Sequence, residues 1–296
     1  MNRTATKIAK IVDPDLALPW PGQGCTASRR WPGLKAKDYS PIPDSWLHTL
    51  TPMHRFFLSP ELLSGETIAF PSGIARQIAL VLRLKPAAHV IVLDGQGSEF
   101  EVELLAVGQE GVHGRIIAPR PARGEPRASI TLYLALTGRE KFEWMLQKCT
   151  EVGAAAFVPV MTSRSLVQDG QQSASKLERW ARIVREAAEQ SQRGIVPPLH
   201  APLRFENALQ QAKAHPLRLI LWEREHTSAL REALAPLKDM PAPTLAVFTG
   251  PEGGFSEREI EAARQAGFQP VTLGKRILRM ETAAVVAAAL ILYELE

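Results

Sequence analysis

Two glycine-containing segments near the C-terminus hold the residue types best suited to binding a ligand. Residues 250–254 have the sequence Gly-Pro-Glu-Gly-Gly and follow the short apolar run 245–249. Residues 273–282 have the sequence Leu-Gly-Lys-Arg-Ile-Leu-Arg-Met-Glu-Thr, which adds cationic groups and a second carboxylate. Glycine lets a backbone come close to a ligand. We expect the two segments to carry the chemistry of this chain.

The first segment restricts the kind of ligand. It matches neither the G-x-x-x-x-G-K-[ST] pattern of phosphate-binding loops nor the G-x-G-x-x-G pattern of dinucleotide-binding folds. The carboxylate of Glu252, close to a helix start, would repel a phosphate. A neutral or cationic adenosyl ligand fits better. Taken alone, however, the segment is equally consistent with a tight turn that binds nothing.

The residues around both segments predict alternating strands and helices. The run before the first segment is β-prone and ends at a turn. Ser256 and Glu259 have the spacing of a capping box, which predicts a helix start. A second strand is expected at 269–273, and Thr282 is expected to cap a closing helix at 283–295. This order predicts an α/β fold whose ligand lies at the carboxyl ends of the strands.

Together the two segments resemble the RsmE family, the 16S ribosomal RNA uridine-N3 methyltransferases of the SPOUT class. Gly-Pro-Glu-Gly-Gly-Phe is followed about twenty residues later by Leu-Gly-x-x-Ile-Leu-Arg-x-Glu-Thr-Ala. Residues 148–153 and 186–193 agree with the same family, and the resemblance extends from Met53 to the C-terminus. Met280 departs from the family, in which a small polar residue is common at this place.

The resemblance implies a domain organisation. It implies a SPOUT methyltransferase domain at 124–296, of α/β type with a trefoil knot, preceded by a PUA-like β-barrel RNA-binding domain at 53–123. Residues 1–52 contain seven prolines and three tryptophans without sustained periodicity, which predicts an irregular or disordered extension. The implied cofactor is S-adenosyl-L-methionine, and the implied partner is 16S rRNA in the small ribosomal subunit.

The implied reaction suggests roles for individual residues. Arg279, between the second segment and the closing helix, is expected to stabilise the uridine anion during catalysis. Either Glu281 or Glu252 is a candidate base, but each is equally consistent with pairing to Arg279 or capping a backbone amide. The cofactor is expected to contact Thr249, Gly250, Glu252, Gly253, Leu273, Gly274, Ile277, Leu278 and Thr282. The substrate RNA is expected to contact Arg55, Arg164, Gln190 and Arg193, although Arg55 is also consistent with a solvated charge at a strand end.

Further strands and helices follow from periodicity and turn residues. Residues 74–84 are expected to form a helix with Ile74, Ile78, Val81 and Leu82 on one face. A second helix at 139–152 is expected to end at Gly153. The apolar helix at 283–295 needs a partner beyond its own domain, and the family implies its twin in a homodimer. Other strands are expected at 67–70, 89–93, 98–107, 112–118, 130–136, 157–161 and 217–222, and other helices at 176–192 and after Thr227 or Ser228.

Composition excludes several classes of protein. The chain has 296 residues, 45% hydrophobic and 22% charged, as in globular proteins with room for two domains. Its two cysteines are too few for a disulfide framework, no spacing suggests a metal site, and Cys149 is expected to be buried. The longest apolar run is shorter than the roughly 20 residues that span a bilayer. We therefore expect a cytoplasmic protein without a metal.

The net charge of +4 gives little information about RNA. Residues 1–52 hold seven Lys and Arg against four Asp and Glu, residues 53–123 hold seven against seven, and residues 124–296 hold 21 against 20. Most of the excess therefore lies in the N-terminal extension, and a basic surface elsewhere would need local clustering.

Two alternatives to the uridine-N3 activity stay open at this point. One is a SPOUT methyltransferase that modifies another RNA position, such as a ribose 2′-OH. The other is a non-catalytic RNA-binding factor in ribosome assembly that retains the fold. A nucleotide oxidoreductase is the least supported class, because its glycine pattern is absent.

Overall fold

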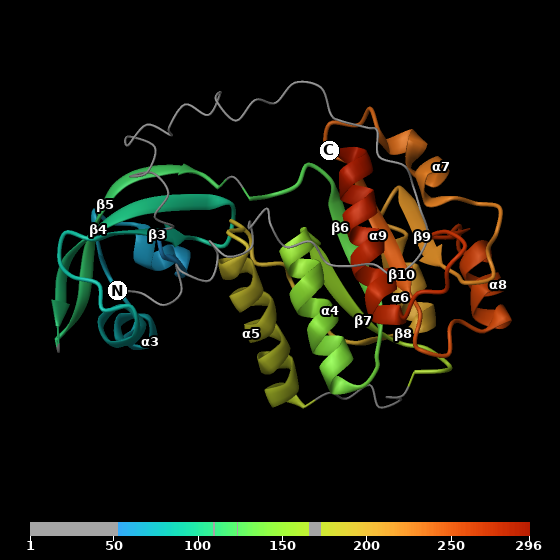
Figure 1. Cartoon of the computed structure of the whole chain (residues 1–296), viewed down its shortest axis with the longest axis horizontal. Helices are drawn as coiled ribbons and strands as arrows, with labels where there is room; N and C mark the ends of the chain where they lie inside the picture. Colours follow the sequence, from blue (N-terminus) through green and yellow to red (C-terminus); the bar gives the residue numbers. More distant parts are fainter. Residues whose placement is uncertain (1–52, 109, 123, 166–172) are drawn as a thin grey trace, which may run out of the picture. The chain divides into compact units, whose positions relative to one another are not determined.

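The computed structural model describes residues 53–108, 110–122, 124–165 and 173–296. The predicted extension at residues 1–52 lies outside the described residues. Residues 53–296 form one unit by their mutual contacts, and the described strands of this unit belong to two separate sheets (Figure 1).

The first sheet has five strands in the order β1-β3-β4-β5-β2. β1 (Arg55–Phe57) runs parallel to β3 (His89–Leu93), and the other neighbours are antiparallel: β4 (Ser98–Gly108), β5 (Gly111–Pro121) and β2 (Thr67–Ala69). The predicted strands are confirmed. Closure of this sheet into a barrel stays a prediction.

The helical segment beside this sheet differs from its prediction. The α-helix α3 (Ser72–Arg76) passes directly into a π-helical turn, η2 (Gln77–Val81), in which the amide of Leu82 donates to the carbonyl of Gln77. The wider turn rotates the side chains, so Val81 is 72% exposed. The expectation that Val81 shares a helix face with Ile78, which is fully buried, is therefore wrong. A short 3-10 helix, η1 (Pro60–Leu63), precedes β2.

The second sheet has six strands, and all of its described neighbours are parallel. The strand order is β11-β9-β10-β6-β7-β8. The bounds are β6 Ser129–Ala135, β7 Ala156–Met161, β8 Leu203–Arg204, β9 Leu217–Leu221, β10 Thr244–Thr249 and β11 Gln269–Val271. A parallel sheet with helical crossovers is the α/β class that the sequence predicts. The trefoil knot stays a prediction.

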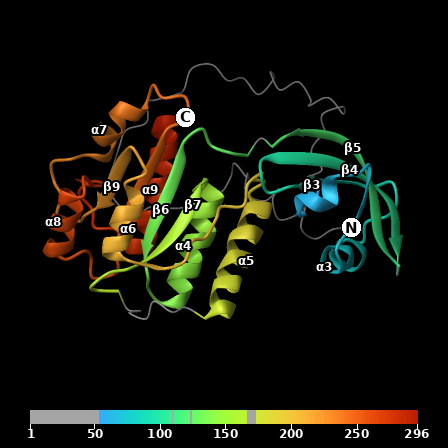
Figure 2. The ribbon, with the colours of Figure 1, turned by 180° about the vertical axis from the view of Figure 1, so that it is seen from behind.

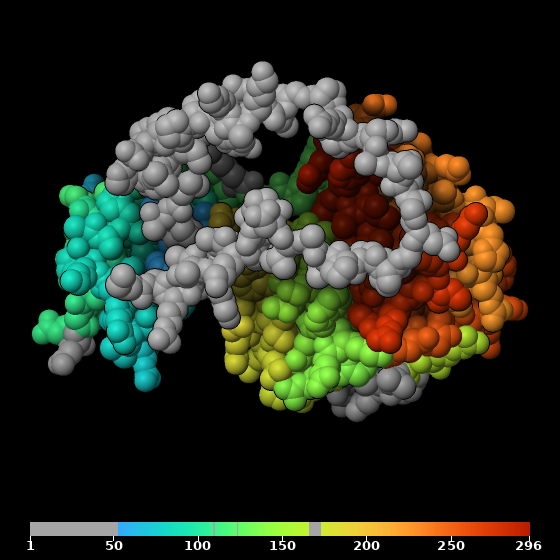
Figure 3. Space-filling model, viewed as in Figure 1, coloured from blue at the N-terminus to red at the C-terminus, as the bar shows by residue number. Residues whose placement is uncertain are grey.

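Helices cover both faces of this sheet. Buried residues of α4, α5, α7 and α9 join one face of the sheet in a single apolar cluster, and those of α6 and α8 join the other face (Figures 1 and 2). The outer sides of α5, α4 and α9 are visible in succession in Figure 3. The bounds are α4 Arg139–Val152, α5 Ala174–Gln190, α6 Phe205–Ala212, α7 Leu230–Leu234, η3 Ala235–Leu237, α8 Glu257–Gln265 and α9 Met280–Leu295.

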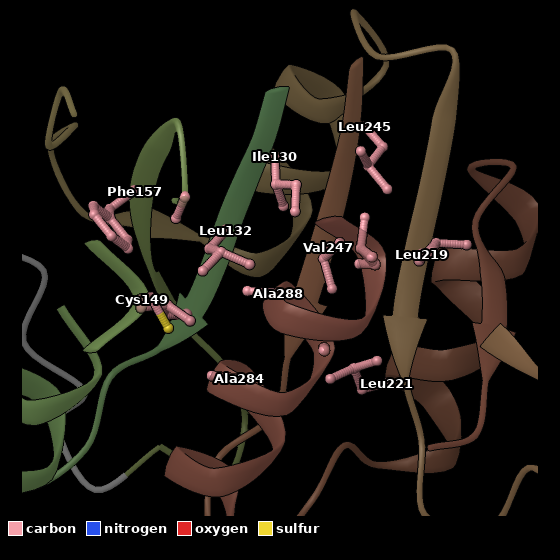
Figure 4. Packing of buried hydrophobic residues seen from close by; sticks show 14 of the residues in the cluster. Ile130, Leu132, Cys149, Phe157, Leu219, Leu221, Leu245, Val247, Ala284 and Ala288 are labelled. Carbon is pink, nitrogen blue, oxygen red and sulfur yellow. The ribbon is translucent and has the colours of Figure 1, made fainter. Parts of the chain in front are cut away.

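The alternation of side chains along the strands explains the two layers of helices. Leu132 and Val247 belong to the cluster with α9, and Figure 4 shows strand side chains close to Ala288 of that helix. The next residues along the same strands, Tyr133 and Phe248, belong to the opposite cluster, where their rings stack with centroids 4.3 Å apart. Both faces are therefore apolar, as in buried parallel sheets.

Local signals for helix ends are partly confirmed. Ser256 and Glu259 form the predicted capping box of α8, and α4 ends with Gly153 in a positive-φ conformation. α9, however, begins at Met280 with Arg279 as its N-cap, so the prediction that Thr282 caps it is wrong. The cap predicted at Thr227 or Ser228 is also wrong, because α7 has Ala229 at its N-cap.

Candidate cofactor and RNA site

A cavity of about 600 Å³ lies at the carboxyl ends of three neighbouring strands, β9, β10 and β11. Both glycine-containing segments line it, the first from the end of β10 and the second between β11 and α9. A third wall comes from residues after β9, among them Trp222, Glu223 and His226. This third wall was not among the residues expected at the site.

The structure gathers most of the expected cofactor residues around this cavity. The lining includes Thr249, Gly250, Glu252, Gly253, Leu273, Gly274, Ile277, Leu278 and Arg279. Thr282, exposed in the first turn of α9, does not line it. Lys141, from the first turn of α4, also lines the cavity and was not expected there.

Two polar atoms in this lining have no partner. Within the described part of the chain, the hydroxyl of Thr249 and one carboxylate oxygen (Oε2) of Glu281 are buried without a hydrogen bond. Leaving such a group unsatisfied costs about 1–3 kcal/mol, so native proteins rarely do so. Both atoms belong to residues that line this cavity.

The first segment is held in place from α4. The hydroxyl of Thr137 donates to the carboxylate of Glu252, and Nζ of Lys141 lies 3.1 Å from the same oxygen. Burial acts to raise the pKa of Glu252, but the hydrogen bond from Thr137 and the charge of Lys141 outweigh it and lower the pKa. Glu252 is therefore a charged anchor for the loop.

Two further contacts hold the same segment. Nη1 of Arg164, in the loop after β7, donates to the carbonyl of Gly253 at 2.7 Å. Gly254 has a φ of +66°, and a Cβ there would lie 2.7 Å from the carboxylate of Glu223. A side chain at this position would be strained and would collide with the third wall. The loop is thus fitted closely between its neighbours.

The carboxylate of Glu225 shapes the third wall. It accepts hydrogen bonds from the backbone amides of His226, Thr227 and Ser228 and from the Thr227 hydroxyl. The hydrogen bonds from Thr227 are the main cause that lowers the pKa of Glu225 to about 2. This turn places His226 against the cavity.

Arg279 is placed at the boundary between the second segment and α9. It is the N-cap residue of α9, its side chain is exposed, and it lines the cavity. Among the described residues it has no ion-pair partner. The neighbouring Ile277 also lines the cavity while 83% exposed. On this side of the cavity, Arg279 therefore offers a cation without an ion-pair partner among the described residues, and Ile277 offers an exposed apolar surface.

A family model described as an RNA methyltransferase domain matches residues 124–292. The chain belongs to this RNA methyltransferase family. Ribosomal RNA small subunit methyltransferase E from Synechocystis sp. is 35% identical over 251 residues, which are 84% of this chain and 80% of that relative.

Two solved structures are similar to this methyltransferase chain. One is ribosomal RNA small subunit methyltransferase E from Neisseria gonorrhoeae bound to S-adenosyl methionine, with 33% identity, a TM-score of 0.72, and coverage of 81% of this chain and 96% of that chain. The other is a putative methyltransferase from Legionella pneumophila in complex with the cofactor SAM, with 30% identity, a TM-score of 0.72 and the same two coverages.

The four residues expected to contact RNA have different surroundings in this methyltransferase. Arg164 is exposed but engaged with the carbonyl of Gly253, as described above. Gln190 is exposed at the last position of α5. Arg55, with 14% of its side chain exposed, pairs with the buried carboxylate of Glu99, which also binds Arg120.

Arg193 is a correction to the expected RNA contacts. Only 2% of this residue is exposed. Its guanidinium donates to the Glu125 carboxylate and to backbone carbonyls inside the protein. A buried and fully engaged arginine is not available to a nucleic acid, so the expectation that Arg193 contacts RNA is wrong.

No helix in the described ranges is both long and apolar enough to cross a membrane. Within those same ranges, no group of three or more His, Cys, Asp or Glu side chains is arranged to hold a metal ion.

Proposed function

We propose that this chain transfers a methyl group from S-adenosyl-L-methionine to a uridine N3 of 16S rRNA in the small ribosomal subunit, and that it acts in the cytoplasm. The observation that carries the proposal is the cavity, which both glycine-containing segments line and in which two buried oxygens lack partners. Membership of the RNA methyltransferase family supports it, as do the two similar structures with this cofactor.

The residues of the cavity fit this cofactor. The cofactor supplies an electrophilic methyl group on a positively charged sulfur, and its ribose and amino groups carry hydrogen-bond donors. The hydroxyl oxygen of Thr249 would accept a hydrogen bond from such a donor. Ile277 and Leu278 would pack against the flat adenine ring, and the backbone of residues 249–253 and 273–274 would approach it closely.

The acceptor atom needs activation. A uridine N3 carries a proton at neutral pH and is a poor nucleophile until that proton leaves. Arg279 would stabilise the negative charge that develops on the uridine oxygens. Two observations support this role: Arg279 lines the cavity, and among the described residues it has no ion-pair partner. Of the two candidate bases, Glu252 is held by Thr137 and Lys141. Glu281, with a free oxygen, is therefore the better candidate.

The remaining parts would serve the RNA and the assembly. We assign RNA binding to residues 53–123 as a PUA-like barrel, with Arg55 and Gln190 as contacts, and methyl transfer to residues 124–296 as a knotted SPOUT domain in a homodimer. The presence of two separate sheets supports the division into two domains.

The test is a methyl-transfer assay with labelled S-adenosyl-L-methionine on small ribosomal subunits that lack this modification. The product nucleoside is identified by mass spectrometry. Arg279→Ala is expected to lower kcat by about 100-fold, the loss typical of one electrostatic group at a reacting centre, and to retain cofactor binding. Arg258→Ala is the matched control, since Arg258 is exposed on α8 and does not line the cavity.

Three outcomes separate the candidate functions. N3-methyluridine that is lost in Arg279→Ala and kept in Arg258→Ala supports both the reaction and the role of Arg279. Label on a ribose 2′-OH or on another base keeps the methyltransferase and rejects the uridine-N3 assignment. Cofactor binding without transfer to any RNA would favour a non-catalytic assembly factor.

A further inference from the structure

The connection between the two sheets contains an ion pair between the buried Arg193 and the partly exposed Glu125. Glu125 lies between the last strand of the first sheet and the first strand of the second, and its Oε2 accepts a hydrogen bond from Nη2 of Arg193 at 2.7 Å. Its Oε1 accepts from the backbone amides of Gly194 and Ile195 at 2.9 and 3.0 Å. The carboxylate of Glu125 therefore joins the linker, the segment between β5 and β6, to the segment that follows α5.

The arginine of this pair reaches a third segment. Nη1 of Arg193 donates to the carbonyl of Ala154 at 2.6 Å and to that of Thr150 at 3.2 Å, at the C-terminal end of α4. Linker, α5 end and α4 end thus meet at one guanidinium. A planar group with five donors is suited to this task, and lysine would not reproduce it.

Close backbone packing surrounds the pair. A Cβ on Gly124 would lie 2.5 Å from the carbonyl oxygen of Gln192, and a Cβ on Gly194 would lie 2.0 Å from Cβ of Ala122. Both separations are shorter than any real contact of this kind. The linker therefore lies directly on the α5 exit, and neither glycine has room for a side chain.

A second set of contacts joins α5 to the first sheet. Phe57 and Leu93, from β1 and β3, form a small buried cluster with Ala188 of α5. The amide of Phe57 lies 3.5 Å from a carboxylate oxygen of Glu189, and the backbone of Gly95 forms an isolated β-bridge with Ile195. The first sheet thus contacts α5 through Ala188 and Glu189 and the segment after α5 through Ile195.

We propose that Glu125 and Arg193 are positioning residues for the methyl-transfer reaction. They fix the first sheet relative to the cavity, so that RNA bound to the first sheet is presented to the cavity. This inference rests on the proposed function. A misplacement of about 1 Å far from the chemistry costs on the order of 100-fold in rate, so a rigid connection has a catalytic consequence without touching the RNA.

Two variants test the pair. Glu125→Gln keeps an acceptor for the Gly194 and Ile195 amides but leaves the Arg193 guanidinium without its counter-charge. Arg193→Met removes the guanidinium at similar length, and because breaking a buried pair is costly, Glu125→Gln is the variant to measure if Arg193→Met does not fold. On whole small subunits, kcat/KM for RNA is expected to fall by about 10- to 100-fold, with the dissociation constant for the cofactor unchanged.

The control separates positioning from general loss of stability. Leu209→Ala removes a buried side chain of α6, on the opposite face of the second sheet and outside the cavity lining. Compared at a temperature at which all variants are folded, Leu209→Ala is expected to keep its kcat/KM for RNA. Small-angle scattering is expected to show a larger radius of gyration for Glu125→Gln and an unchanged one for Leu209→Ala.

The outcomes are distinguishable from failure of the proposed function. If the wild type methylates RNA and Glu125→Gln keeps its kcat/KM and its scattering profile, the positioning role is rejected. It is also rejected if Glu125→Gln loses cofactor affinity in parallel with activity. If the wild type transfers no methyl group to RNA, it is the proposed function that fails; in that case an unchanged scattering profile for Glu125→Gln would overturn the rigid connection independently.

Discussion

At the scale of single residues, the cavity lining contains polar atoms that have no hydrogen-bond partner within the described residues. The hydroxyl of Thr249 is buried at the end of β10 without a hydrogen bond. Thr249→Val keeps the shape and removes the unsatisfied hydroxyl, so we expect the free protein to gain about 1 kcal/mol in stability. The same change is expected to weaken cofactor binding by about 10-fold, because a hydrogen bond to the ligand is lost.

Thermal unfolding and calorimetric titration with the cofactor measure the two effects. Thr150→Val is the matched control, since the hydroxyl of Thr150 is buried but donates to the carbonyl of Leu146 at 2.7 Å. This control is expected to lose stability and to keep its cofactor affinity. Equal losses of stability in both variants would contradict a ligand-binding role for Thr249.

Glu225 provides a prediction for pH. Its folded pKa of about 2 lies below the unfolded value of 4.5. The turn therefore contributes stability that is fully present above about pH 4.5 and is lost as the pH falls toward 2. Glu225→Gln, which lacks the charge, is expected to be less stable than the wild type at pH 7, with a difference that shrinks at pH 4 and again at pH 3.

Urea unfolding at these three pH values checks this expectation. Glu178→Gln serves as the control, because Glu178 is exposed on α5, away from this turn. A stability difference for Glu225→Gln that does not vary between pH 7 and pH 3 would show that the charge of Glu225 does not contribute to the free energy of unfolding.

The fate of Arg193 shows what single residues in a sequence leave open. Gln190 and Arg193 are three positions apart, and both were expected to face RNA. The helix ends at Gln190, and Gln192 then takes a φ of +62°, which turns the chain inward. The partner of Arg193 is Glu125, far away in the sequence. Such long-range pairs leave no local signal, and the same is true of the third wall of the cavity.

At the scale of elements, local signals predicted helix ends only where one candidate was available. The capping box of Ser256 and Glu259 was readable because both partners lie within one turn. Thr227 was a poor choice of cap because its hydroxyl binds Glu225. The helix α6 was not predicted, although Phe205, Ala208, Leu209 and Ala212 are buried at helical spacing and would have indicated it.

Glu259 connects the start of α8 with the loop after β7. Its carboxylate accepts hydrogen bonds from the amides and hydroxyls of both Ser256 and Ser163. Glu259→Ala removes the cap and this connection, so we expect a loss of about 2 kcal/mol at pH 7 and weaker cofactor binding, since both loops adjoin the first glycine segment.

The loss should depend on pH. Burial acts to raise the pKa of Glu259, but its hydrogen bonds outweigh burial and lower it below 4.5. The contribution is therefore present above pH 4.5 and lost as the pH falls below it. Urea unfolding at pH 7 and pH 3.5 measures this, with Glu261→Ala, exposed on the same helix, as control. A loss equal to that of the control at pH 7 would show that the connection is unimportant.

At the scale of the whole molecule, the α/β class followed from the order of strands and helices, because that order is a local property. The strand order β11-β9-β10-β6-β7-β8 did not follow, since pairing between distant strands depends on the packing of complete layers. The cavity location did follow from the class, because the carboxyl ends of parallel strands meet at one edge of the sheet.

The outer side of helix α9 is expected to form an interface between two copies of this chain. The helix is apolar over most of its surface, and on its outer side Tyr293 is 81% exposed and Leu290 is 42% exposed. Exposed apolar groups on a long helix are typical of an interface between subunits.

The wild type is expected to elute with twice its chain mass of 32.6 kDa. Leu290→Asp combined with Tyr293→Asp is expected to give the monomer. Leu80→Asp, at a 61% exposed position of the π-helical turn, is the matched control and should remain dimeric. Light scattering coupled to gel filtration distinguishes these masses, and a monomeric wild type or an unaffected double variant would rule out an interface through α9.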